Sequence, residues 1–107
     1  MPRERLLTLL AEVRRELEMI YCDRLAGVYL YGSYARGEAN EDSDIDIAVV
    51  LRGDVSPWKE RALISDALGE ISLRENCLLT AIYVPEEDWK RARYAVHRSI
   101  RRDGIAI

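Results

Sequence analysis

The sequence has 107 residues, of which 49% are hydrophobic and 33% are charged, and its formal net charge is −3. A chain of this length fits one domain, so we expect residues 1–107 to form a single domain. The acidic balance leaves no general basic surface for direct binding of nucleic acid, and no apolar run approaches the length of a membrane span. The first residues lack the apolar segment of a signal peptide, so we expect a cytoplasmic protein that does not contact the membrane.

The first part of the chain predicts a helix, a strand and a turn. Apolar residues recur at helical spacing from Leu6 onwards and predict an amphipathic helix over residues 3–24. Residues 26–31 are rich in β-formers and are followed by Gly32-Ser33, so we expect a strand there. Residues 34–42 are polar and turn-like, and they are expected to open with a helical turn.

The second part predicts two strands, each followed by a helix. Residues 44–51 form the first of these strands. Ser56-Pro57 then begins a helix that runs to Arg74. Residues 77–84 are nearly all apolar, which predicts a strand buried on both faces. Pro85 begins a last helix that stops at Gly104. This order of elements indicates an α/β (α+β) fold, in which a small sheet packs against helices.

Two features around the first two predicted strands point to phosphate chemistry. Gly32 allows backbone N–H groups to approach an anion closely, and Ser33 adds a hydroxyl group. Asp44 and Asp46 project from the same face of their strand, opposite to Ile45. Two carboxylates in this arrangement suit Mg²⁺, which takes oxygen ligands from one or two carboxylates and from substrate phosphates. Either feature alone is more simply a plain turn or a solvated strand end, but the two together favour a metal and triphosphate site.

Gly32-Ser33, ten intervening residues and Asp44-x-Asp46 resemble the signature of the polymerase-β-like nucleotidyltransferases. The size of the chain and Ala35-Arg36-Gly37 in the loop resemble the minimal nucleotidyltransferases, a branch that includes antitoxins. The resemblance implies a small mixed sheet. It also implies that Gly32 and Ser33 hold the triphosphate of ATP and that Asp44 and Asp46 ligate Mg²⁺, as two ions.

Members of this family usually carry a third acidic residue on a later strand, where it helps to activate the attacking hydroxyl. Residues 77–84 contain no acid, and Glu75 is the nearest candidate for a third catalytic carboxylate. Arg36 is a candidate phosphate ligand, although an ion pair with Glu38 or Glu41 explains it equally well. We expect His97, the only histidine, to be a surface residue rather than a catalytic base.

The resemblance suggests three functions. The first is transfer of AMP from ATP to a hydroxyl of an acceptor, specifically a tyrosine of a partner HEPN-type toxin, by a chain that acts as the antitoxin. The second is an ATP-binding antitoxin of weak catalytic power that neutralises its partner by forming a complex, and the missing acid favours this reading. The third, less favoured, is a nucleotidyltransferase that modifies a small molecule such as an antibiotic. Small size and a thin core also suggest a homodimer or a hetero-oligomer.

Overall fold

The computed structural model describes residues 1–107 and contains a four-stranded mixed sheet in the order β3-β2-β1-β4. Strand β1 is antiparallel to both β2 and β4, whereas β2 and β3 are parallel. The expected α/β class with a small mixed sheet is therefore confirmed. The elements are α1 (Arg3–Tyr21), a 3₁₀ turn (Cys22–Arg24), β1 (Leu25–Tyr31), α2 (Ser33–Arg36), β2 (Ile45–Leu51), α3 (Pro57–Glu75), β3 (Leu79–Pro85), α4 (Glu86–Arg91), α5 (Ala95–Asp103) and β4 (Ile105–Ala106).

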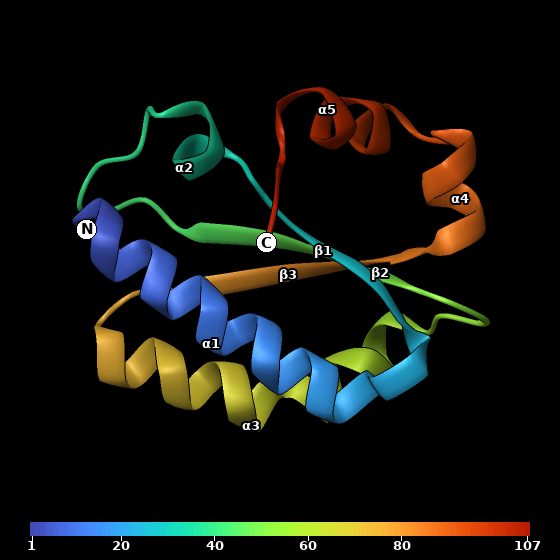
Figure 1. Ribbon diagram of the computed structural model, residues 1–107, viewed down its shortest axis with the longest axis horizontal. Helices are drawn as coiled ribbons and strands as arrows, with labels where there is room; N and C mark the ends of the chain where they lie inside the picture. The colour runs from blue at the N-terminus through green and yellow to red at the C-terminus, as the bar shows by residue number, and fades with distance from the viewer.

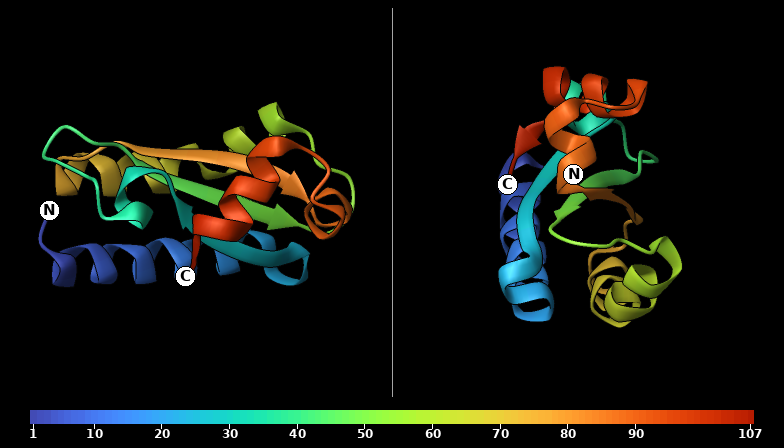
Figure 2. Two further views of the ribbon diagram at one scale, coloured as in Figure 1. Left: turned by 90° about the horizontal axis from the view of Figure 1, so that it is seen from above. Right: turned by 90° about the vertical axis from the view of Figure 1, so that its right-hand side faces the viewer.

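The sheet separates two layers of helices. Helices α1 and α3 cover one face, and α2, α4 and α5 lie over the other (Figures 1 and 2). The main core fills the space between the sheet and the α1–α3 pair. Ile45, Ile47 and Val49 of β2 enter this core and are fully buried. Because side chains alternate along a strand, Asp46 and Ala48 face the opposite layer. None of the helices is both long enough and apolar enough to span a membrane.

Strand β3 lies at the edge of the sheet and is not buried on both faces, so the prediction from its apolar run was wrong. Only Leu79 and Val84 are buried, and the residues between them are half-exposed. Parallel pairing with β2 covers one side of the strand, while its other side has no neighbouring strand. An apolar run by itself therefore does not distinguish an edge strand from a strand in the middle of its sheet.

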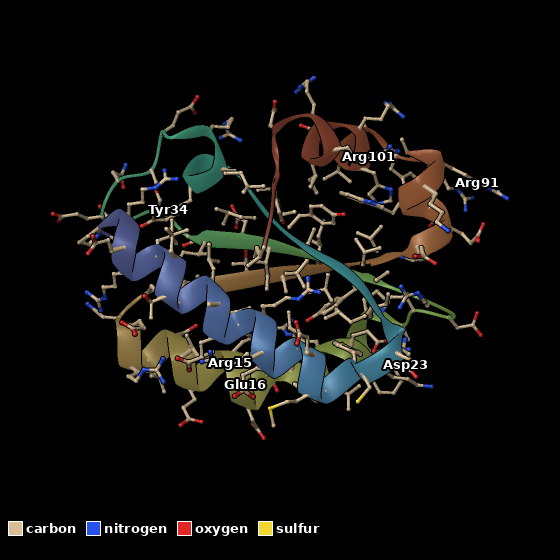
Figure 3. The ribbon with its side chains drawn as sticks, viewed as in Figure 1. Arg15, Glu16, Asp23, Tyr34, Arg91 and Arg101 are labelled. Carbon is tan, nitrogen blue, oxygen red and sulfur yellow. The ribbon has the colours of Figure 1, made fainter.

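The predicted last helix is interrupted. Ala92 has φ 48° and ψ 48°, a left-handed conformation that ends α4, and α5 begins three residues later. The ring of Trp89 stacks on Tyr29 with 4.6 Å between centroids. Arg101 of α5, labelled in Figure 3, donates hydrogen bonds to the carbonyls of Trp89 and Lys90. The turn thus folds α5 back over β1.

His97 is buried beneath this turn, and its expected place on the surface was wrong. Only 6% of the residue is exposed. Its ring lies 5.2 Å from that of Tyr94 and 6.5 Å from that of Trp89, measured between centroids. The surrounding arginines made the helix look solvated, but α5 buries the one face that carries His97 and Ile100.

Glu60 is a buried charge near the start of α3, with 3% of its surface exposed. Its carboxylate accepts hydrogen bonds from the Arg24 guanidinium at 3.3 and 3.4 Å and from the Ser56 N–H at 3.2 Å. Burial alone would raise the pKa of Glu60, but the hydrogen bonds from Arg24 and Ser56 outweigh burial and lower it. These contacts connect the beginning of α3 to the turn before β1.

Candidate functional site

The end of β1 runs directly into the predicted phosphate-binding turn. Gly32 has φ 74° and ψ −156°, a conformation available almost only to glycine. Its carbonyl accepts hydrogen bonds from the N–H groups of Ala35 and Arg36, which start the short helix α2. A Cβ at Gly32 would overlap the Oδ2 atom of Asp46. The glycine is therefore required both by the turn and by the approach of Asp46.

Asp46 lies in the middle of a row of three side chains across the sheet. It pairs with Tyr31 of β1 on one side and with Thr80 of β3 on the other. The Thr80 hydroxyl donates a hydrogen bond of 2.5 Å to Asp46 Oδ1. Burial, and to a smaller extent the charge of Asp46, raises the pKa of the Tyr31 phenol. The structure therefore brings Gly32 and Asp46 together, as the motif predicts.

Asp44 immediately precedes β2 and is exposed. It lines an open hollow of about 420 Å³ at the end of the sheet where β2 and β3 begin. The rest of the hollow comes from the loop before β2 and from the end of α3 with the turn that follows: Glu41, Asp42, Ser43, Ser72, Leu73, Asn76, Cys77 and Leu78. The aspartate thus stands between the strand that carries Asp46 and a space open to solvent.

The two aspartates are suited to bind a hard cation that is also coordinated by the phosphates of a bound nucleotide. Asp44 and Asp46 offer only carboxylate oxygens, which Mg²⁺ prefers over softer ligands. The structure contains no group of three or more His, Cys, Asp or Glu side chains that could hold a metal ion by themselves. Water and the oxygens of a triphosphate would have to complete the coordination, as is common for Mg²⁺.

Glu75 is the last residue of α3, and the structure gives it a different set of partners. Its carboxylate accepts a hydrogen bond from Arg5 Nε at 2.9 Å and also forms an ion pair with Arg74. The hydrogen bond from Arg5 is the largest cause that lowers the pKa of Glu75. The absence of any cluster of three acids means that Glu75 does not gather with Asp44 and Asp46. It connects the start of α1 to the end of α3.

The remaining predicted residues of the loop flank the turn. Ser33 is the first residue of α2, is half-buried, and accepts a hydrogen bond from the Glu38 N–H on its carbonyl. Arg36 donates to the Glu38 carboxylate at 3.2 Å, which is one of the two ion pairs considered for it. Tyr34, labelled in Figure 3, packs from α2 against the core. The turn is thereby anchored to the body of the domain.

Comparison with known proteins gives matches over most of the chain. Residues 10–102 match the family described as nucleotidyltransferase domain. Two proteins of Methanocaldococcus jannaschii, both named as candidate protein adenylyltransferases, are similar to the chain. One is 30% identical over 77 residues, which is 72% of this chain and 77% of the relative. The other is 33% identical over 92 residues, which is 85% and 86% of the two chains.

Solved structures share the fold at lower identity. A candidate nucleotidyltransferase from Sulfolobus solfataricus has a TM-score of 0.61 at 21% identity and covers 94% of this chain and 79% of its own. A toxin–antitoxin structure, MntA-HpeT, has a TM-score of 0.63 at 16% identity and covers 90% and 69% of the two chains. A toxin–antitoxin structure with AMP-PNP has a TM-score of 0.61 at 19% identity, with the same coverage of 90% and 69%.

Proposed function

Because the chain belongs to the nucleotidyltransferase domain family, which its residues 10–102 match, we propose that it transfers AMP from ATP to a hydroxyl group in a reaction that requires Mg²⁺. The observation that carries the proposal is the close approach of Asp46 to Gly32. It joins the turn suited to phosphate with a carboxylate suited to a cation, although 13 residues of sequence separate the two.

The roles of the residues follow from their chemistry. Gly32 and Ser33 would hold the triphosphate, with Arg36 beside it, and Asp44 and Asp46 would hold the metal, as two ions. The acceptor oxygen attacks the α-phosphorus, the bond from this phosphorus to the oxygen bridging to the β-phosphate breaks, and pyrophosphate leaves. The acceptor proton passes to a base. Mg²⁺, when bound, neutralises charge on the triphosphate and on the departing pyrophosphate.

We further propose that the acceptor is a tyrosine of a partner HEPN-type toxin and that the chain acts in the cytoplasm as the antitoxin of the pair. Two similarities support this choice. The relatives from Methanocaldococcus jannaschii are named as candidate protein adenylyltransferases, which favours a protein acceptor. The structures with a similar fold include toxin–antitoxin complexes, one of them with an ATP analogue.

Incubation of the chain with labelled ATP, Mg²⁺ and the product of the adjacent gene tests the proposal. We expect label on that product, its loss when Mg²⁺ is chelated, and its loss in the folded double variant Asp44→Asn with Asp46→Asn. A matched double variant, Asp54→Asn with Asp66→Asn, removes the same charge at exposed positions elsewhere and should retain activity. Transfer by the Asp44 and Asp46 variant at the rate of the parent would place the site elsewhere.

A second candidate function has one observation in its favour. Thr80, and not an acid, pairs with Asp46 on β3, so the described residues supply no third carboxylate at this position. The chain would then bind ATP and neutralise its partner by forming a complex. In that case the Asp44 and Asp46 double variant should still protect cells from the partner, whereas an antitoxin that acts by transfer should lose protection in the same variant.

A further inference from the structure

The two carboxylate oxygens of Asp46 have different neighbours. Oδ1 accepts the hydrogen bond from the Thr80 hydroxyl. Oδ2 lies against Gly32, so closely that no Cβ could be placed there. A carboxylate at a strand position with water on one side usually rotates among several orientations. At Asp46 the neighbours on either side define which oxygen faces which strand.

The position of Thr80 makes this hydrogen bond a product of the sheet rather than of a mobile loop. Thr80 pairs directly with Asp46 in the parallel ladder between β2 and β3, and pairing continues on both sides, from Ile45 with Leu79 to Leu51 with Pro85. Asp46 makes no other side-chain hydrogen bond in the structure. Thr80 is therefore the one side chain that orients this carboxylate by donating a hydrogen bond to it.

We propose that Thr80 is a positioning residue for Asp46. Its hydroxyl donates a hydrogen bond to Oδ1. Oδ2, on the side of Gly32, then remains available to bind the cation next to the triphosphate. The proposal rests on the proposed function in one respect, because it takes Asp46 to be a metal ligand. It adds a residue that does not itself contact metal or nucleotide and that is absent from the Gly-Ser and Asp-x-Asp motif.

The expected consequence concerns affinity for the metal and the nucleotide. A donor that orients a ligating carboxylate lowers the cost of organising the site, and the loss of such a partner typically weakens metal affinity by about 10–100-fold. Thr80→Val keeps the shape of the side chain and its preference for a strand, but it removes the hydroxyl. Thr80→Ser keeps the hydroxyl and removes the methyl group. The two variants therefore separate the hydrogen bond from packing.

The test is calorimetric titration with Mg²⁺ and an ATP analogue that has a methylene bridge between the α- and β-phosphates, which cannot be cleaved where AMP transfer would cleave it. We expect Thr80→Val to weaken binding by about 10–100-fold and Thr80→Ser to remain near the parent. Ile82→Val, two residues along the same face of β3 and paired with Ala48, is the matched control and should also bind like the parent. Circular dichroism establishes that each variant is folded. If Thr80→Val does not fold, Thr80→Ala takes its place with the same expectation.

The outcomes separate this proposal from the proposed function. If Thr80→Val binds like the parent while Asp44→Asn with Asp46→Asn abolishes binding, Thr80 has no positioning role and the proposed site stands. Equal losses in Thr80→Val and Thr80→Ser would show that any change of this side chain weakens binding, so the loss in Thr80→Val could not be assigned to the hydrogen bond, which also overturns the proposal. If the Asp44 and Asp46 double variant itself binds like the parent, the proposed function fails, and the assignment of Thr80 fails with it.

Discussion

At Gly32 the backbone adopts φ 74° and ψ −156°, and the Oδ2 atom of Asp46 occupies the place of a possible Cβ. We therefore expect Gly32→Ala to displace Asp46 or the turn. The variant should lose binding of Mg²⁺ with ATP by at least about 10-fold, and strain of this kind costs about 1–3 kcal/mol of stability. Calorimetric titration and urea unfolding measure the two effects.

Gly37→Ala is the matched control for this variant. Gly37 also has a positive φ, of 72°, but no atom lies within 4 Å of a Cβ built there. It should lose some stability through backbone strain and keep its affinity for the nucleotide. If both variants bind nucleotide equally well, the contact between Gly32 and Asp46 has no part in the site.

Thr80 also offers a way to test the missing acid. Thr80→Asp places a carboxylate beside Asp46, where it could accept the proton of the acceptor hydroxyl. A positioned general base contributes about 10²–10⁴-fold to a rate, and we expect the variant to gain part of this, up to about 10²-fold. The assay is transfer of label to the acceptor at saturating Mg²⁺ and ATP, so that differences in metal affinity do not enter.

Glu75→Gln completes this experiment. Because Glu75 is engaged by Arg5 and Arg74, we expect the rate of transfer to stay at that of the parent. A result in which Glu75→Gln eliminates transfer and Thr80→Asp gains nothing would identify Glu75 as the third carboxylate. Fast transfer by the parent, insensitive to both changes, would mean that the site is not impaired.

Among the elements, those with local signals were predictable and those set by distant contacts were not. The periodicity that predicted a helix over residues 3–24 and the Ser56-Pro57 start identified α1 and α3 within a few residues. The break at Ala92 has no such local signal in the sequence. Left-handed residues that end a helix are usually glycine or asparagine, and this one is alanine. The packing of Trp89 on Tyr29 accompanies this break, and these two residues are 60 positions apart in the sequence.

The same distinction applies to the candidate site. Gly32, Ser33, Asp44 and Asp46 are close in sequence, so their spacing was sufficient to make them candidates. The partner of Asp46 on β3 depends on strand order and on a parallel register across α3, which no local pattern encodes. For this reason the sequence left Glu75 as the nearest candidate for a third acid.

The contact between α3 and the turn before β1 predicts a dependence of stability on pH. Glu60→Gln should lower the free energy of unfolding at pH 7 by about 1.5–3 kcal/mol, since hydrogen bonds to a charged group are lost. Because the pKa of Glu60 is lowered in the folded state, its contribution is fully present above pH 4.5, the usual glutamate value, and is lost as the pH falls through the folded value. Urea unfolding at pH 7, 5 and 3.5 measures it.

The difference between the parent and Glu60→Gln should thus shrink as the solution becomes more acidic. Glu70→Gln, an exposed position on the same helix with no ion pair in the structure, is the control and should differ little from the parent at any of these pH values. A difference for Glu60→Gln that is constant with pH would show that shape and packing, not charge, explain its effect.

At the scale of the whole molecule, many large apolar side chains remain outside the core. They are Leu7, Met19, Trp58, Leu63, Leu73, Leu78, Tyr94, Val96 and Ile105, each at least 47% exposed. A domain this small buries only part of its apolar surface, so exposed apolar side chains favour association. We expect the chain to co-elute with the product of the adjacent gene, or to form a homodimer, in size-exclusion chromatography at micromolar concentration. Separate elution of two monomers would contradict this.

Strand β2 carries core residues on one face and Asp46 on the other, so its two faces cannot be exchanged. A slip of one residue against β1 or β3 would turn Asp46 towards α1 and α3 and would remove Ile45 and Ile47 from the main core. A carboxylate buried without a partner is costly, so the slipped sheet would be unstable as well as unable to bind a cation. The fraction of molecules that bind Mg²⁺ with nucleotide should therefore equal the fraction whose sheet has the correct register. A titration of binding sites in a preparation would then also measure how much of the protein is correctly folded.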